Sequence, residues 1–95
     1  FRIVALRDIR NHNTKALIPK GTVGGFVSSF SNLSHSGGCW IYDGSTVKGD
    51  ATVSGEAIIT GCVTIDGDAH INGNAIITGY VTIDGNTDMS EDTLE

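Results

Sequence analysis

Histidine is the residue type in this chain best suited to acid–base chemistry, because its ring changes charge near neutral pH. The chain holds three of them, His12, His35 and His70. A histidine can act as a general base toward a substrate hydroxyl or amine, and three that converge can hold zinc. His35 and His70 lie 35 residues apart, and the sequence repeat described below has a period of 18 residues. Because 35 is one short of two full periods, the two side chains are expected to face different directions. We therefore predict no metal site and no cofactor.

The two cysteines, Cys39 and Cys62, offer no disulfide framework, because two are too few for one. Cys39 falls at an inward position of the repeat described below and Cys62 at a corner, so a bond between them would have poor geometry. Reduced thiols, together with the lack of a visible secretory signal, favour a cytoplasmic protein, or one of the host cytoplasm if the chain is encoded by a phage.

Composition restricts the classes of partner. The 95 residues suffice for one small domain, and 13 of them are glycine. A net charge of −5 argues against direct binding to nucleic acid or to an anionic membrane surface, since both require basic patches. No apolar run approaches the roughly 20 residues of a membrane span.

A six-residue repeat decides the architecture. Glycine recurs at every sixth position from Gly49 to Gly85, and counting back in sixes reaches further turn-forming residues. An aliphatic residue stands two positions before most of these glycines and a small residue two positions after, which gives eleven units from Val23 to Asp88. Residues 55–68 and 73–86 match at 11 of 14 positions with an offset of 18, so three units make one larger period.

The repeat predicts an all-β triangular solenoid. Each side of the triangle is a short strand, each glycine makes a corner, and the aliphatic residue of each unit fills the interior. Strands of successive coils are expected to pair in parallel.

This pattern resembles the hexapeptide repeat of left-handed parallel β-helices, the fold of many acyltransferases and of γ-class carbonic anhydrases. The resemblance implies a left-handed helix of about 3.5 coils of 18 residues, although crossover connections in general favour the opposite hand. Residues Val23–Val27, Asn32–His35 and Cys39–Trp40 resemble a narrower group, small phage and enterobacterial hexapeptide-repeat proteins that are labelled as transferases.

The chain divides into three predicted segments. Residues 1–22 depart from the repeat and are expected to form a capping β-hairpin, with a strand at 2–6, a turn at 10–13 and a return strand at 15–18. Residues 23–88 form the β-helix, and residues 89–95 form an acidic tail.

One outward column of the triangle is apolar, which usually marks a contact surface. The members of this predicted interface are Trp40, Tyr42, Ile58, Thr60, Ile76, Thr78 and the corner residue Tyr80. The alternative is that the N-terminal hairpin folds back over Trp40 and leaves only part of the column free.

Three functions are compatible with these features. The first is a non-enzymatic binding or structural module that acts through protein–protein contacts and self-association as a dimer or trimer, with a host or phage protein as partner. The second is a trimeric acyltransferase-like enzyme with His70 or His35 as general base. The third is a polymer-forming solenoid similar to bactofilins. The transferases carry a loop inserted between coils, whereas the eleven units here run without insertion, so we favour the first.

Overall fold

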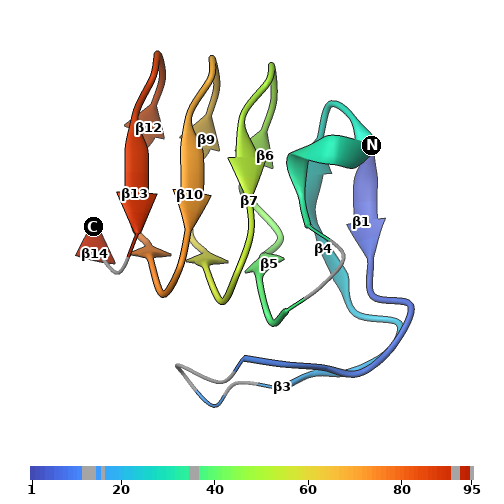
Figure 1. The fold of residues 1–95 in the computed structure, drawn as a ribbon. Coiled ribbons are helices and arrows are strands. Elements are labelled where there is room, and N and C mark those ends of the chain that lie inside the picture. Colours follow the sequence, from blue (N-terminus) through green and yellow to red (C-terminus); the bar gives the residue numbers. More distant parts are fainter. Residues whose placement is uncertain (12–14, 16, 35–36, 91–92, 95) are drawn as a thin grey trace.

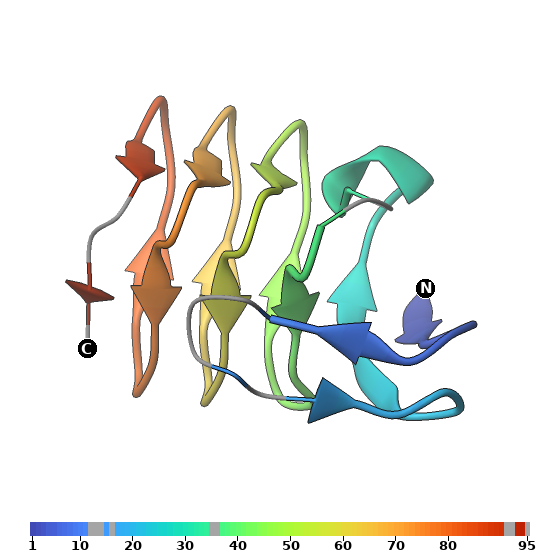
Figure 2. The same ribbon diagram turned by 60° about the horizontal axis from the view of Figure 1, so that its bottom comes forward.

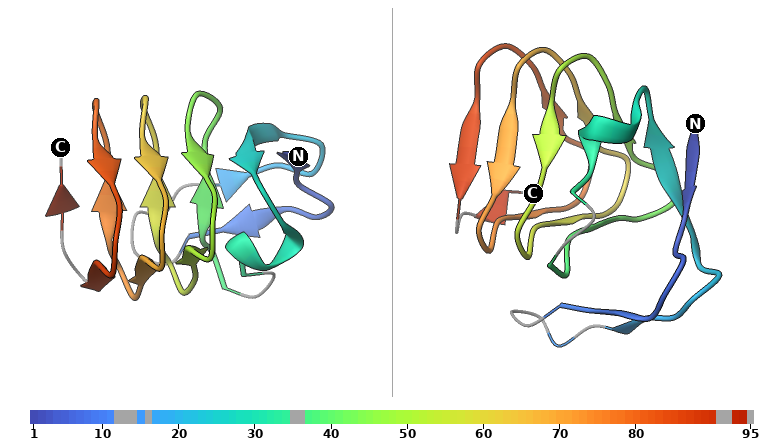
Figure 3. Two further views of the ribbon diagram at one scale, coloured as in Figure 1. Left: turned by 90° about the horizontal axis from the view of Figure 1, so that it is seen from above. Right: turned by 45° about the vertical axis from the view of Figure 1, so that its right-hand side comes forward.

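The computed structural model confirms an all-β chain in which short parallel strands stack as a β-solenoid of about three turns (Figure 1). The structure describes residues 1–11, 15, 17–34, 37–90 and 93–94. Successive coils lie side by side along one axis, with the N-terminal segments at one end and β14 at the other (Figures 1 and 3).

Three sheets form the walls of the solenoid, and a two-stranded sheet lies outside them. The first wall has the order β1 (Arg2–Val4), β4 (Val23–Val27), β6 (Thr46–Val47), β9 (Thr64–Ile65) and β12 (Thr82–Ile83). The second has the order β13 (Asp88–Ser90), β10 (His70–Asn72) and β7 (Thr52–Val53). The third has the order β14 (Thr93–Leu94), β11 (Ile76–Ile77), β8 (Ile58–Ile59) and β5 (Trp40–Ile41). The outer pair is β2 (Ile9–Arg10) with β3 (Leu17–Ile18), and the 3₁₀ turn η1 covers Phe30–Asn32.

The aliphatic positions of the repeat form the core, as predicted. Nine side chains at a spacing of six point inward and are at most 9% exposed: Ile41, Val47, Val53, Ile59, Ile65, Ile71, Ile77, Ile83 and Met89. The small residues after the corners, among them Ala51, Ala57, Ala69 and Ala75, are also buried. The solenoid is therefore held by a continuous apolar column rather than by separate coils, which cannot bury an apolar face alone.

Glycine at the corners meets both a conformational and a steric demand. Gly61 has a φ of 92°, in a region that residues with a Cβ avoid. A Cβ at this position would also lie 2.5 Å from the carbonyl oxygen of Gly79 in the next coil. The six-residue glycine spacing thus follows from coils that stack through their backbones.

The first coil departs from the predicted register. Phe26 and Val27 pair with Thr46 and Val47, an offset of 20 rather than 18. Leu33 likewise bridges to Val53, while Ile41 keeps the offset of 18 to Ile59. Two extra residues therefore lie between Leu33 and Ile41, and the prediction of eleven units without insertion is wrong in this coil.

This shift changes which residues of the first coil face inward. Val27 and Leu33, which we expected at the small position after a corner, are the buried aliphatic residues. Val23, which we expected to point inward, is 46% exposed. Positions 25 and 31 are not corners, since they lie within β4 and η1. Gly37 keeps the corner geometry, with a φ of 76° and a Cβ position 2.6 Å from the carbonyl oxygen of Gly55.

The predicted pairing of the N-terminal segment is also corrected. β1 does not pair with a return strand at 15–18 but runs antiparallel to β4 and extends the first wall. The hairpin consists instead of β2 and β3, which pair through Ile9 with Ile18 and Arg10 with Leu17. Figure 2 shows this hairpin lying across the outer face of the wall that contains β5 and β8.

The solenoid continues into the segment that we expected to be an acidic tail. Met89 lies in β13, in register with Ile71, and is 9% exposed. β14 pairs with β11 at an offset of 17, since Thr93 lies opposite Ile76. The predicted segments 1–22, 23–88 and 89–95 follow the sequence pattern. The strand pairing crosses both of their boundaries, because β1 pairs with β4 and β13 pairs with β10.

Candidate functional site

The apolar column of the third wall is covered at one end. Trp40 is 2% exposed and Ile58 is 6% exposed, and both belong to the same apolar cluster as Ile18 of β3. The hairpin lies over β5 and β8 (Figure 2). The expectation of an exposed stripe is therefore wrong at Trp40 and Ile58, and the alternative of a hairpin folded back over Trp40 is the arrangement observed.

Asn11 fixes this hairpin to two coils at once. Its side chain is fully buried, and its Nδ2 donates to the carbonyl oxygens of Gly38 at 3.0 Å and Glu56 at 2.7 Å. These two carbonyls belong to corners of adjacent coils. Because one amide bridges both corners, the hairpin has a defined position along the solenoid axis.

The rest of the predicted interface lies beyond the hairpin. Ile76 and Thr78 are partly exposed, and Tyr80, at the corner before β12, is 91% exposed. Tyr42 and Thr60 are partly exposed as well. The most exposed member of the column, Tyr80, therefore lies in the last coil, and the role of the column as an interface remains a prediction.

His70 lies on an exposed polar wall. Its Nδ1 is 2.9 Å from Oγ1 of Thr52, one coil before, and Asp88 stands in register with it one coil after. The three residues form a line along the outer surface of the second wall. His12 and His35, the latter being the other candidate base, lie outside the described residues.

The outer edge of the last coil is a further candidate site, and an open strand edge there is what the sequence pattern predicts where the repeat ends. In the preceding coils alternate backbone N–H groups donate to carbonyls 17 residues further on, as from Thr46 to Val63 and from Thr64 to Val81, both at 2.9 Å. Thr82 and Asp84 continue this series, and no residue that the structure describes accepts their N–H groups. β12 and β13 are the outermost strands of their walls.

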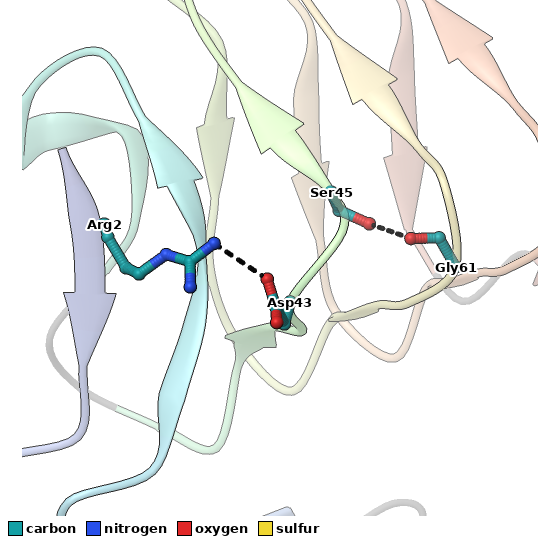
Figure 4. A network of polar contacts seen from close by, with 4 residues as sticks. All are labelled: Arg2, Asp43, Ser45 and Gly61. Atoms are coloured by element: carbon teal, nitrogen blue, oxygen red, sulfur yellow. Dashed lines mark hydrogen bonds and ion pairs between the residues drawn. The ribbon is translucent and has the colours of Figure 1, made fainter.

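At the opposite end of the solenoid, β1 covers the edge of β4 in the first wall. The backbone N–H of Val27 donates to Phe1 at 2.7 Å, and the amino group of Phe1 donates back to the carbonyl of Val27 at 2.7 Å. Arg2 of β1 forms an ion pair with Asp43 at 3.0 Å, and Oγ of Ser45, fully buried, donates to the carbonyl of Gly61 at 2.9 Å (Figure 4). These contacts join β1, the first full coil and the second coil.

A cavity of about 610 Å³ lies at this N-terminal end, between β1 with the loop that follows it, η1 and Trp40. Sequence reasoning missed it, because its lining combines the N-terminal segment, which has no repeat, with the first coil, whose register the repeat does not predict. One sequence signal was available: Leu6 and Phe30 are large apolar residues outside the inward positions of the repeat, and they are 85% and 79% exposed. Large exposed apolar residues that gather in one place are a recurrent feature of binding sites.

Within the described part of the chain, no three His, Cys, Asp or Glu side chains cluster as metal ligands would. The same residues include no helix with the length and apolar character needed to traverse a bilayer.

The chain matches no protein-family model, no curated protein and no solved structure.

Proposed function

We propose that this protein is a non-enzymatic β-solenoid module that acts through protein–protein contacts, beginning with self-association at the outer edge of its last coil. The observation that carries the proposal is the outer edge of β12 and β13, against which no strand of the described residues pairs. An exposed strand edge is a template for a further strand, whose backbone groups supply affinity without requiring a particular sequence.

The geometry of the last coil supports end-on addition. Its N–H groups follow the same spacing as those that join the preceding coils, so an added strand would meet a ladder already in register. Tyr80 is exposed beside this edge, and aromatic residues are enriched in the cores of protein interfaces. The resemblance to hexapeptide-repeat proteins of phages and enterobacteria agrees with a rigid module of this kind, left-handed and cytoplasmic. Neither Cys39 nor Cys62 forms a disulfide, which suits a reducing compartment.

Sedimentation velocity over a concentration series tests the proposal. The informative variant is Thr82→Pro, because proline removes the N–H that finds no acceptor within the described chain. We expect the wild-type protein to form larger species as concentration rises, and Thr82→Pro to stay at the monomer mass of 9.9 kDa. Thr82→Ala is the matched control, since it removes the side chain and keeps the N–H, and it should associate like the wild type.

A wild-type protein that stays monomeric over the series would overturn the proposal, as would equal association of Thr82→Pro and Thr82→Ala. The form of the assembly separates two versions of it. A closed dimer or trimer gives a discrete mass, whereas stacking end to end, as in the bactofilin-like alternative, gives a continuous distribution that lengthens with concentration.

The acyltransferase-like alternative keeps one supporting observation, the alignment of Thr52, His70 and Asp88 on the second wall. A hydrogen-bonded histidine next to a carboxylate is a familiar arrangement for a general base. If the alternative is right, His70→Ala abolishes transfer of an acetyl group from acetyl-coenzyme A to an amine acceptor, while Asn72→Ala on the same strand does not. Absence of any turnover by the wild type leaves the binding module as the function.

A further inference from the structure

The N-terminal cavity has the size and lining of a small-molecule site. Its volume of about 610 Å³ falls within the range of about 300–1,000 Å³ in which ligand pockets occur. Ile3, Val4, Ala5 and Leu6 contribute an apolar lining from one side, and Leu33 and Trp40 from the other. Such a surface is suited to the apolar body of a ligand.

Trp40 contributes a polar atom that needs a partner. Its side chain is 2% exposed and lines the cavity, yet its Nε1–H finds no acceptor in the described structure. A buried donor without an acceptor costs about 1–3 kcal/mol, so an unpaired one in a folded protein calls for an explanation. A ligand that brings an acceptor oxygen would satisfy this donor.

Arg7 supplies a positive charge at the rim of the same cavity. It is exposed and lines the cavity, and the hydrogen bond found for its guanidinium is to the carbonyl oxygen of Asp8 at 3.4 Å. Arg2, by contrast, also lines the cavity but is already paired with Asp43 at 3.0 Å. Arg7 is therefore the cation that remains available for an anionic group among the described residues of the lining.

Cys39 does not compete for that charge. Burial raises the pKa of its thiol from 9.0 to about 11, while the nearby Arg7 charge acts in the opposite direction. The thiol thus stays protonated and neutral at physiological pH, and the site has an unsatisfied donor and a cation over an apolar lining.

We propose that this cavity binds a small amphiphilic carboxylate, with a fatty-acyl type of apolar body against Leu33 and Trp40 and its carboxylate held by Arg7 and the Nε1–H of Trp40. A carboxylate provides acceptor oxygens for both donors, and bonds between charged partners are the stronger ones. This site is at the opposite end from the edge of β12 and β13 and does not depend on self-association.

The test uses dodecanoate below its micelle concentration, followed by the fluorescence of Trp40, which is the single tryptophan of the chain. We expect a saturable change in emission as the ligand satisfies the buried indole. Dodecanol, which has the same chain and no charge, should bind about tenfold more weakly. Arg7→Gln should weaken dodecanoate about tenfold and leave dodecanol unchanged.

Two variants complete the design. Lys48→Gln removes an equal charge from an exposed position outside the cavity lining, so it should bind dodecanoate within twofold of the wild type. Trp40→Phe keeps an apolar ring and loses the donor, and calorimetry should show binding weakened several-fold. Thermal unfolding by circular dichroism checks that each variant folds.

Three results would overturn the proposal: no saturable change with dodecanoate, equal affinity for dodecanol and dodecanoate, or an equal effect of Arg7→Gln and Lys48→Gln. If Trp40→Phe loses both binding and its thermal transition, the variant has unfolded and does not test the role of the indole N–H. The comparison of Arg7→Gln with Lys48→Gln, both at exposed positions, then decides whether the cavity binds the carboxylate.

Discussion

The first coil and the coils after it satisfy their backbone hydrogen-bonding groups by different means. In the regular coils, from Ile41 to Met89, backbone N–H groups meet carbonyls of the next coil at a constant spacing, and no side chain is needed for this. In the first coil the ladder continues at a spacing of 19, as from Ser34 to Val53. Two buried asparagines, Asn11 and Asn32, add side-chain bonds to the coil that follows. The regular coils therefore rely mainly on their backbone ladder, whereas the first coil also uses buried side-chain amides.

Asn32 is the clearest case. It is 1% exposed, its Oδ1 accepts the backbone N–H groups of Ser28 and Ser29 at 2.9 and 2.8 Å, and its Nδ2 donates to the carbonyls of Gly49 and Ala51 at 3.2 and 2.7 Å. One side chain thus serves two backbone donors of the first coil and two acceptors of the next.

The largest effect is expected from Asn32→Ala. The substitution leaves partly buried backbone groups without partners, and each such group costs about 1–3 kcal/mol. We expect the free energy of unfolding to fall by about 3 kcal/mol. Urea denaturation followed by circular dichroism measures it.

Asn86→Ala is the matched control for this variant, because Asn86 is an exposed asparagine at a corner of the last coil. It should change the free energy of unfolding by no more than about 0.5 kcal/mol. Similar values for the two asparagines would show that the first coil does not depend on its side-chain bonds.

The second prediction compares two corners that differ in what stacks on them. Gly67 and Gly85 have similar φ values of 73° and 70°, so alanine is strained to the same extent at both, by about 1–2 kcal/mol. A Cβ on Gly67 would lie 2.6 Å from the backbone nitrogen of Gly85, while a Cβ on Gly85 meets nothing within 4 Å.

Gly67→Ala should therefore reduce the free energy of unfolding by about 1–2 kcal/mol more than Gly85→Ala does. Both are measured by urea denaturation at a concentration low enough to keep the protein monomeric. At high concentration Gly85→Ala should in addition oppose association, because a strand added at the edge would meet the new methyl group. Equal destabilisation by the two alanines would contradict the close stacking of corners.

The contrast between the first coil and the regular coils also explains how much of the fold and register could be predicted from the sequence. Where one residue pattern recurs, as at Ile59, Ile65 and Ile71, the fold, the corners and the buried positions followed directly. In the first coil the glycine spacing gave a wrong register, because Val27 and Leu33 could be assigned to either of two positions and only their packing decides between them.

The sites were less predictable than the fold for the same reason. The hairpin that covers Trp40 and Ile58 is anchored by the bonds of Asn11 to two carbonyls distant in the sequence. A single asparagine does not recur in the sequence, so no repeat predicts these bonds. The cavity likewise involves Arg7, which looks like any surface arginine until its place at the rim is known.

The third prediction contrasts the two cysteines. Cys39 lies in the seam between the first coil and the regular coils and is 3% exposed, while Cys62 lies at an exposed corner. Because burial raises the pKa of the Cys39 thiol to about 11, the folded state holds that proton more tightly than the unfolded state does. This stabilisation is present below pH 9 and is lost as the pH rises toward 11.

The difference in free energy of unfolding between the wild type and Cys39→Ala should accordingly shrink between pH 9 and pH 11, and Cys62→Ala should show no such trend. Iodoacetamide at pH 8 provides a second measurement: Cys62 should be alkylated in the folded protein and Cys39 only after unfolding in urea. Rapid alkylation of both would contradict the burial of Cys39.

The smallest effects are expected from two exposed ion pairs among the described residues, one near the first coil and one in the regular coils. Arg2 and Asp43 lie 3.0 Å apart, with the Arg2 guanidinium 4.5 Å from the ring centroid of Phe26, while Lys48 and Asp66 are 4.0 Å apart. Double-mutant cycles should give a coupling of about 0.5 kcal/mol for the first pair and about 0.2 kcal/mol for the second. Salt at 0.5 M should reduce the first value, since screening acts on exposed charges. A larger coupling for the Lys48 pair would mean that side-chain charges, and not the backbone ladder, hold the regular coils together, and the distinction between the two regions would then fail.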